Sequence, residues 1–322
     1  MSGKIRKVVV ARELLPAGEQ LLQDHFDVHS GGLGAGRSEL LELVPGASAI
    51  VADPTVPIDA QVLAAAGEGL ELIANFAVGY DNVDREACRR AGVLLTNTPG
   101  VLTNATAELA LGLTLAAARQ IPSAELNLRE GLWSGWNPSD YRGIELSGAT
   151  VGVVGMGRIG LRYAQLMAGF AGDLLYTSRS VKSEVEQRFA ARRVSLEVLL
   201  RESDVISLHL AAATENHHLI DREAIAMMKP GAILVNTGRG SQVDADALAS
   251  ALHENRLGAA GLDVFENEPG VPESLKDAPR AVLTPHIGSA TFRARDAMAE
   301  LVAKNVISVL DGNGPLTPVS PG

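Results

Sequence analysis

The sequence predicts an α/β protein with two parallel sheets, each covered by helices on both faces. Short apolar runs of strand length alternate with segments of helical periodicity along most of the chain, which is typical of parallel sheets. One of these runs ends in a Gly-x-Gly-x-x-Gly pattern that leads into a helix. With 322 residues, the chain is long enough for two domains that each bury a core.

The N-terminal third accounts for the first sheet. Its predicted strands are the apolar runs Lys7–Ala11, Ala47–Ala52, Leu70–Asn75 and Val93–Thr96. Pro16 starts a predicted helix that reaches Phe26, because proline needs no amide donor at the first helical position. Asp59 begins a second predicted helix that ends near Ala66. Helices placed between successive strands indicate parallel pairing.

The rest of the chain predicts a second sheet and a closing helix. A long apolar helix, Asn104–Arg119, is expected to connect two domains. The β-branched run Ala149–Val154 predicts a strand, and apolar residues at helical spacing from Ile159 to Phe170 predict the helix after it. Further strands are predicted at Leu174–Thr177, Val205–Leu208, Ala232–Asn236, Gly258–Asp263 and Ala281–Thr284. The last helix, Ala290–Leu310, carries an apolar stripe.

The junction after Val154 reads Gly155-Met156-Gly157-Arg158-Ile159-Gly160. In such a loop the first glycine allows a tight turn, the second lets the backbone approach a pyrophosphate, and the third lets helix and strand pack closely. The start of the helix then offers amide donors and a positive dipole to phosphate. The strand and helix that flank this pattern predict a Rossmann-type dinucleotide-binding unit.

These elements predict a discontinuous first domain. We expect the last helix to return to the N-terminal sheet, so that residues 1–101 and 288–322 form a flavodoxin-like substrate domain. Residues 102–287 would then form a Rossmann cofactor domain inserted into it. The segment Gly312–Gly322 is rich in proline and glycine and is expected to be a surface tail.

Composition narrows the class of protein. The net charge of −10 argues against a nucleic-acid partner. No apolar stretch is long enough for a membrane span, and none follows the short basic cluster Lys4–Lys7 as a signal sequence would require. The single cysteine, Cys88, cannot form an internal disulfide and is expected to be a structural thiol. These features predict a cytoplasmic enzyme.

Three polar residues each follow a predicted strand near the end of the chain: Arg239, Glu268 and His286. A fixed cation, a carboxylate and a histidine can together bind an oxo acid and deliver a proton to its carbonyl. The flanking Gly238 and Gly240 suit a place where a ligand approaches the backbone around Arg239. The three residues therefore predict a reductive site.

Four motifs in order resemble those of the D-isomer-specific 2-hydroxyacid dehydrogenase family. They are Gly155–Gly160, Asn236-Thr-Gly-Arg-Gly240, Gly261-Leu-Asp-Val-Phe-Glu-Asn-Glu-Pro269 and Pro285-His-Ile-Gly-Ser-Ala290. The similarity runs almost end to end. It implies an NAD(P)-dependent enzyme that interconverts a small 2-oxo acid and its D-2-hydroxy acid.

The resemblance also implies roles for individual residues. Arg239 anchors the substrate, His286 donates the proton on reduction, and Glu268 orients the ring of His286. Val78 and Gly79 match the family loop whose amides hold the substrate carboxylate. The implied cofactor contacts are Gly155, Gly157, Arg158, Ile159, Gly160, Thr106, Thr214, Thr237, Asp263 and Gly288. Before Thr214, three alanines replace the proline-containing loop that is usual in the family.

The choice of cofactor depends on the strand after the glycine loop. An NAD-preferring unit ends that strand in an acid that binds ribose hydroxyls. Here it ends in Ser178, Arg179 and Ser180, whose hydroxyls and guanidinium suit a 2′-phosphate. We therefore expect NADP(H) to be preferred over NAD(H), with Arg179 as the main phosphate contact.

Within the family, the chain most resembles glyoxylate and hydroxypyruvate reductases, in the segments Asn75–Asn82, Leu132–Pro138, Thr177–Ser180 and Pro285–Thr291. The alternatives are a broader 2-ketoacid or 2-ketogluconate reductase, a phosphoglycerate dehydrogenase-like enzyme, and a dinucleotide-sensing binding protein. Family likeness also implies a homodimer, in which Trp136 either reaches the neighbouring subunit's pocket or packs within its own loop. No metal site is expected, because the loop pair His217 and His218 lacks a ligand pattern and is predicted to be solvated.

Overall fold

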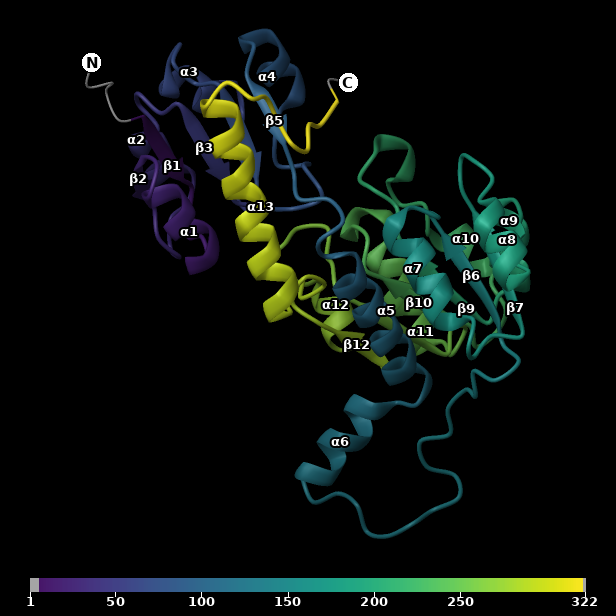
Figure 1. Cartoon of the computed structure of the whole chain (residues 1–322). Coiled ribbons are helices and arrows are strands. Elements are labelled where there is room, and N and C mark those ends of the chain that lie inside the picture. The colour runs from purple at the N-terminus through teal and green to yellow at the C-terminus, as the bar shows by residue number, and fades with distance from the viewer. Residues whose placement is uncertain (1–5, 321–322) are drawn as a thin grey trace, which may run out of the picture. The chain divides into compact units, whose positions relative to one another are not determined.

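The computed structural model describes residues 6–320, which fold into two compact units. Residues up to 102 and from 290 onward belong to the first unit, and residues 103–289 form the second. Each unit contains one parallel sheet with helices around it (Figure 1). The predicted fold class, α/β with two parallel sheets, is confirmed.

The sheet of the first unit has the strand order β2-β1-β3-β4-β5, with every pair parallel. Its strands are β1 (Lys7–Val10), β2 (Asp27–Ser30), β3 (Ala49–Ala52), β4 (Leu72–Asn75) and β5 (Leu94–Thr96). This is the flavodoxin-like order. Strand β2 was not predicted, because this edge strand is polar and only partly buried.

Helices cover both faces of this sheet. They are α1 (Pro16–Gln23), α2 (Arg37–Leu43), α3 (Ala60–Ala66), α4 (Arg85–Ala91) and α13 (Phe292–Leu310). Val8 and Val10 pack with α1 and α13, whereas Val9 between them packs with α2, α3 and α4. This alternation follows from the two-residue period of a strand. Cys88 is buried in α4, and burial raises the pKa of its thiol to about 11.

The C-terminal segment is attached to the first unit rather than forming a free surface tail. The amide of Val319 donates to the carbonyl of Leu95 at 2.8 Å, and Pro318 forms a bridge with Thr96. The hydroxyl of Thr317 donates to the carbonyl of Asn97 at 2.6 Å. Over its described part this segment lies at the surface, as expected, and its backbone pairs along the edge strand β5.

The second unit contains a seven-stranded parallel sheet in the order β12-β11-β10-β9-β6-β7-β8. Its strands are β6 (Thr150–Val154), β7 (Asp173–Thr177), β8 (Arg192–Arg193), β9 (Val205–Leu208), β10 (Ile233–Asn236), β11 (Ala259–Leu262) and β12 (Ala281–Leu283). The chain runs outward from β6 in one direction and then from β9 in the other. That is the Rossmann order, which places ligands beyond the carboxyl ends of the strands near β6.

Helices also cover both faces of the second sheet. They are α5 (Thr103–Ala118), α6 (Ile121–Arg129), α7 (Arg158–Met167), α8 (Ser183–Phe189), α9 (Leu196–Glu202), α10 (Arg222–Met227), α11 (Ala245–His253) and α12 (Glu273–Lys276). Val151 and Val153 pack with α5 and α7, and Val154 packs with α9, α10 and α11. Among the helices of residues 6–320, none is long and apolar enough to cross a membrane.

Residues 121–143, here called the arm, extend from the second unit as α6 and a long loop (Figure 1). Seven large apolar side chains of the arm are exposed to solvent. They are Ile121, Leu126, Leu128, Leu132, Trp133, Trp136 and Tyr141. Trp136 alone is 84% exposed. A patch of this kind on a protein surface marks an interaction site.

Candidate active site

The glycine loop after β6 has the geometry that its pattern predicts. Gly155 has a φ of +94°, a conformation that favours glycine. A Cβ on Gly160 would lie 2.1 Å from the carbonyl oxygen of Gly155, so only glycine lets α7 pack this close to β6. By contrast, the position of a Cβ on Gly157 is open, with no atom within 4 Å.

The open space beside Gly157 lies at the start of α7, a ten-residue helix. Gly157 is the N-cap of this helix. It has no side chain that could accept a hydrogen bond from the first amides of the helix, which belong to Arg158 and Ile159. Uncapped amides and the positive end of a helix dipole together bind phosphate. The loop and helix therefore fit the pyrophosphate of a dinucleotide.

The turn after β7 carries no acidic residue. Ser178 donates its hydroxyl to the carbonyl of Ser180, and Arg179 is exposed. Arg193, in β8, donates from Nε to the carbonyl of Ser178 at 3.1 Å and from Nη2 to that of Arg179 at 3.3 Å. Arg193 thus fixes the turn and adds a second guanidinium beside it. Arg193 could not be predicted from the sequence, because only the parallel pairing of β7 with β8 brings it there.

Asp263, directly after β11, organises the loop that carries His286. Its Oδ1 accepts from the hydroxyl of Thr284 at 2.6 Å and from the amide of Ile287 at 2.8 Å, and its Oδ2 accepts from the amide of Gly288 at 2.8 Å. The side chain is buried, and burial raises its pKa despite these donors. Both carboxylate oxygens are therefore occupied by the loop itself.

The other residues predicted to contact the cofactor follow strands of this sheet or lie in α5. Thr106, at the start of α5, is buried and donates its hydroxyl to the carbonyl of Gly288 at 3.1 Å. Thr237, directly after β10, is also buried. Thr214 is exposed at the start of the short helix Thr214–Asn216. Their contacts with a cofactor stay predictions.

His286 and Glu268 form a close pair. His286 Nδ1 lies 2.6 Å from Glu268 Oε2, and Glu268 Oε1 accepts from the amide of Phe265 at 2.9 Å. The two side chains are 50% and 32% exposed. With Nδ1 committed to the carboxylate, Nε2 of the imidazole is left to face a reactant.

Each member of this pair changes the pKa of the other. The hydrogen bond that His286 donates to Glu268 raises the pKa of His286 above its usual value, against a smaller opposing effect of burial. Burial acts to raise the pKa of Glu268, but the bond with His286 and the amide of Phe265 outweigh it, so this pKa is lowered. The ionised carboxylate and the protonated ring therefore stabilise one another.

Arg239 follows β10 in a loop held by Asn236. The amide group of Asn236 donates to the carbonyl of Arg239 at 2.8 Å, and its Oδ1 accepts from the amide of Gly238 at 2.9 Å. Arg239 is half-buried, and Nη1 donates to the carbonyl of Gly238 at 2.8 Å. Its positive charge acts to lower the pKa of both Glu268 and His286, so Arg239 is near enough to influence this pair electrostatically.

Comparisons with known proteins identify the family to which the chain belongs. The family model "D-isomer specific 2-hydroxyacid dehydrogenase, NAD binding domain" matches residues 111–288. The chain belongs to this family. It is an NAD(P)-dependent 2-hydroxyacid dehydrogenase, and its cofactor is a nicotinamide dinucleotide.

Relatives and solved structures support the same assignment. The chain is 44% identical over 315 residues to a glyoxylate reductase of Thermococcus litoralis, covering 96% of this chain and 95% of that one. A structure from Thermus thermophilus is 43% identical, with a TM-score of 0.90 and coverage of 98% and 100%. An NADPH-dependent glyoxylate/hydroxypyruvate reductase from Sinorhizobium meliloti, solved with NADP and malonate, is 32% identical. Its TM-score is 0.88, with coverage of 99% and 98%.

Another histidine of this dehydrogenase, His209, lies against the glycine loop and was not predicted as a site residue. His209 Nε2 is 2.9 Å from the hydroxyl of Ser207, and Nδ1 is 3.3 Å from that of Thr237. Burial lowers the pKa of His209 to about 3, so its ring is neutral at physiological pH. Both ring nitrogens of His209 therefore have hydroxyl partners, in Ser207 and Thr237.

In the first unit, the carbonyl groups of Ala77 and Val78 accept hydrogen bonds from residues of another loop. Asn97 donates to the carbonyl of Val78 at 2.8 Å, and the amide of Thr98 donates to that of Ala77 at 2.9 Å. In a trans peptide the carbonyl and the following amide point in opposite directions. The amides of Val78 and Gly79 therefore point away from Asn97 and Thr98, as an anion-binding loop requires.

Proposed function

We propose that this dehydrogenase uses NADPH to reduce glyoxylate to glycolate and hydroxypyruvate to D-glycerate. The hydrogen-bonded pair of His286 and Glu268, beside the guanidinium of Arg239, carries the proposal. It supplies a proton donor and a cation of the kind that reduction of a 2-oxo acid needs. The names of the relatives described above favour these two small substrates.

The reaction adds a hydride and a proton across a carbonyl group. When bound, NADPH supplies the hydride to the carbonyl carbon. Arg239 binds the substrate carboxylate and polarises the carbonyl oxygen with its planar donors. As negative charge develops on that oxygen, Nε2 of His286 delivers its proton there. Glu268 holds the ring by Nδ1 and stabilises its charged form before the transfer.

We extend the proposal to Val78 and Gly79 as further ligands of the substrate carboxylate. Their amides are aimed by the bonds that Asn97 and Thr98 make to the preceding carbonyl groups. Two convergent amides bind a carboxylate without adding a charge that would need its own partner. A small oxo acid would thus be held by its carboxylate, and its carbonyl group would be left available for reduction.

A panel of 2-oxo acids tests the function. NADPH and NADH oxidation would be followed by absorbance with glyoxylate, hydroxypyruvate, 2-ketogluconate and phosphohydroxypyruvate. The highest kcat/KM is expected for NADPH with glyoxylate or hydroxypyruvate. A higher kcat/KM with either of the larger acids would reassign the substrate. Tight NADPH binding without turnover of any acid would instead indicate a dinucleotide-sensing protein.

Arg179 is proposed to bind the 2′-phosphate of NADPH, with Ser178 and Ser180. Arg179→Ala should raise the KM for NADPH by about 10- to 150-fold, since a hydrogen bond to a charged group contributes about 1.5–3 kcal/mol. The KM for NADH should change little. The matched control is Arg192→Ala, which removes a nearby guanidinium that pairs with Glu202 instead. An equal loss with both cofactors would contradict this role.

Reduction should depend on pH through His286. Its raised pKa keeps the proton donor charged to higher pH, so kcat/KM should be constant at low pH and fall as the pH rises through that pKa. Glu268→Gln removes the largest cause of the shift and should move the fall to lower pH. Glu273→Gln, on the exposed start of α12, is the control. An unchanged profile in Glu268→Gln would refute the coupling.

We also propose that the protein is a homodimer whose subunits associate through the arm, with Trp136 reaching the pocket of the neighbouring subunit. The exposed apolar side chains of residues 121–143 support it. A Leu128→Glu, Leu132→Glu protein should be monomeric by light scattering, because charges would replace the apolar contact. The control is Leu33→Glu, which is also exposed but lies outside the arm. A wild-type monomer would contradict the proposal.

A further inference from the structure

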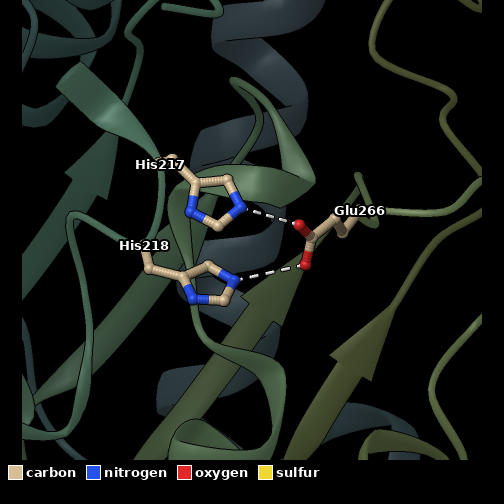
Figure 2. A group of neighbouring side chains, drawn as sticks. All are labelled: His217, His218 and Glu266. Carbon is tan, nitrogen blue, oxygen red and sulfur yellow. Dashed lines mark hydrogen bonds and ion pairs between the residues drawn. The ribbon is translucent and has the colours of Figure 1, made fainter. Parts of the chain in front are cut away.

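Two histidines and one carboxylate converge outside the site described above. His217 Nε2 lies 3.0 Å from Glu266 Oε1, and His218 Nε2 lies 3.2 Å from Glu266 Oε2 (Figure 2). The histidines follow the short helix Thr214–Asn216 after β9, and Glu266 follows β11. The two histidines were expected to be solvated, because sequence alone does not place Glu266 opposite them.

The backbone turns both rings to one side. Adjacent side chains in an extended segment point in opposite directions. His218 instead has a φ of +46°, in the left-handed region that a residue with a side chain rarely adopts. The rings of His217 and His218 consequently stack, with centroids 4.0 Å apart and planes at 24° (Figure 2). Such strain persists only where the surroundings enforce it.

Both sides of the cluster are anchored on the segment Gly240–Gln242. The amide of His218 donates to the carbonyl of Ser241 at 2.8 Å, and the amide of Ile220 donates to that of Gln242 at 2.9 Å. On the other side, a Cβ on Gly240 would lie 2.2 Å from the amide nitrogen of Glu266, so the two backbones touch. The fold therefore fixes the backbone from which the three side chains extend.

The cluster offers one ligand atom from each residue, and these atoms all lie within 4.8 Å of one another. Two imidazole nitrogens and a carboxylate oxygen are a donor set that zinc and related cations accept. The side chains are 54%, 37% and 35% exposed, so a cation could enter and keep water in a remaining position. The imidazoles also lower the pKa of Glu266, which keeps its carboxylate ionised.

From this geometry we propose that His217, His218 and Glu266 bind a divalent transition-metal ion of the zinc class. The ion replaces the protons that now lie between each imidazole and the carboxylate, with both rings neutral. It joins the loop after β9 to the loop after β11. The proposed reduction does not use this ion, so the site is a separate property of the protein and does not depend on that function.

Calorimetric titration of tag-free, EDTA-dialysed protein with Zn²⁺ tests the site. Wild type is expected to bind one ion per chain. His218→Ala and Glu266→Gln should each weaken binding by at least about 10- to 100-fold, the range seen even for residues that only support a metal ligand. His253→Ala, at the exposed end of α11, is the matched control and should bind as wild type does. Equal affinity in wild type and both ligand variants overturns the proposal.

Two further measurements distinguish metal binding from misfolding of a variant and from a cluster that makes only hydrogen bonds. Thermal unfolding without metal should be similar in wild type and Glu266→Gln, whereas Zn²⁺ should raise the Tm of wild type alone. Co²⁺ as a spectroscopic probe should give visible absorption bands from nitrogen ligands in wild type and lose them in His218→Ala. A wild type without a Tm shift or these bands would show that the cluster only ties the two loops by hydrogen bonds.

Discussion

A His286→Ala protein is expected to reduce glyoxylate with kcat lowered by about 10²- to 10⁴-fold, the usual contribution of a positioned general acid. The physical reason lies in the pair with Glu268. The 2.6 Å contact holds the ring by Nδ1 and raises the pKa of His286, so the protonated form is the one poised to react. Alanine removes the proton, and water would have to supply it.

Steady-state kinetics with NADPH would measure the loss, and fluorescence titration would show that the cofactor still binds. Binding should survive, because the glycine loop and α7 do not depend on the ring of His286. The small residual rate should also lose the pH dependence expected for wild type. A His286→Ala protein with full turnover would refute the assignment of the proton donor.

Replacing Arg239 is expected to have an effect of similar size on kcat/KM. Two charge-assisted hydrogen bonds from one guanidinium contribute about 1.5–3 kcal/mol each, so Arg239→Ala should lower kcat/KM by about 10²- to 10⁴-fold. Arg239→Lys should recover part of the loss, because it keeps the charge but lacks the planar fork. Kinetics over a range of glyoxylate concentrations would separate the KM and kcat effects.

The arginine at position 222 provides the control for this experiment. Arg222 is exposed at the start of α10, and its change to alanine should leave kcat/KM unaltered. Since Arg239 also lowers the pKa of His286, Arg239→Ala should extend the active range to higher pH while the overall rate falls. Unchanged KM and kcat in Arg239→Ala would contradict substrate anchoring.

Much of the fold could be predicted because its central strands are buried on both faces. Runs such as Ala49–Ala52 and Ile233–Asn236 are short, apolar and separated by helical segments, and the structure has strands there. The edge strands β2 and β8 could not be predicted because they are polar, and β8 has only two residues. Short helices such as α12 are too brief to show a period.

The candidate site shows a similar division. Arg239, Glu268 and His286 each follow a strand of one parallel sheet, so sequence order alone places them at one edge. Arg193 and Glu266 could not be found in this way. Each acts on a segment far away in the chain, and only the pairing of β8 with β7 or the contact of Gly240 with Glu266 brings them into position.

The three hydrogen bonds to Asp263 have a consequence for when the reactive geometry is set. They fix the backbone from Thr284 to Gly288 within the folded chain. The conformational entropy of that loop is therefore lost during folding and not when substrate arrives. Substrate binding energy remains available to align the carbonyl group, and His286, the proposed proton donor, is already oriented before each substrate molecule binds.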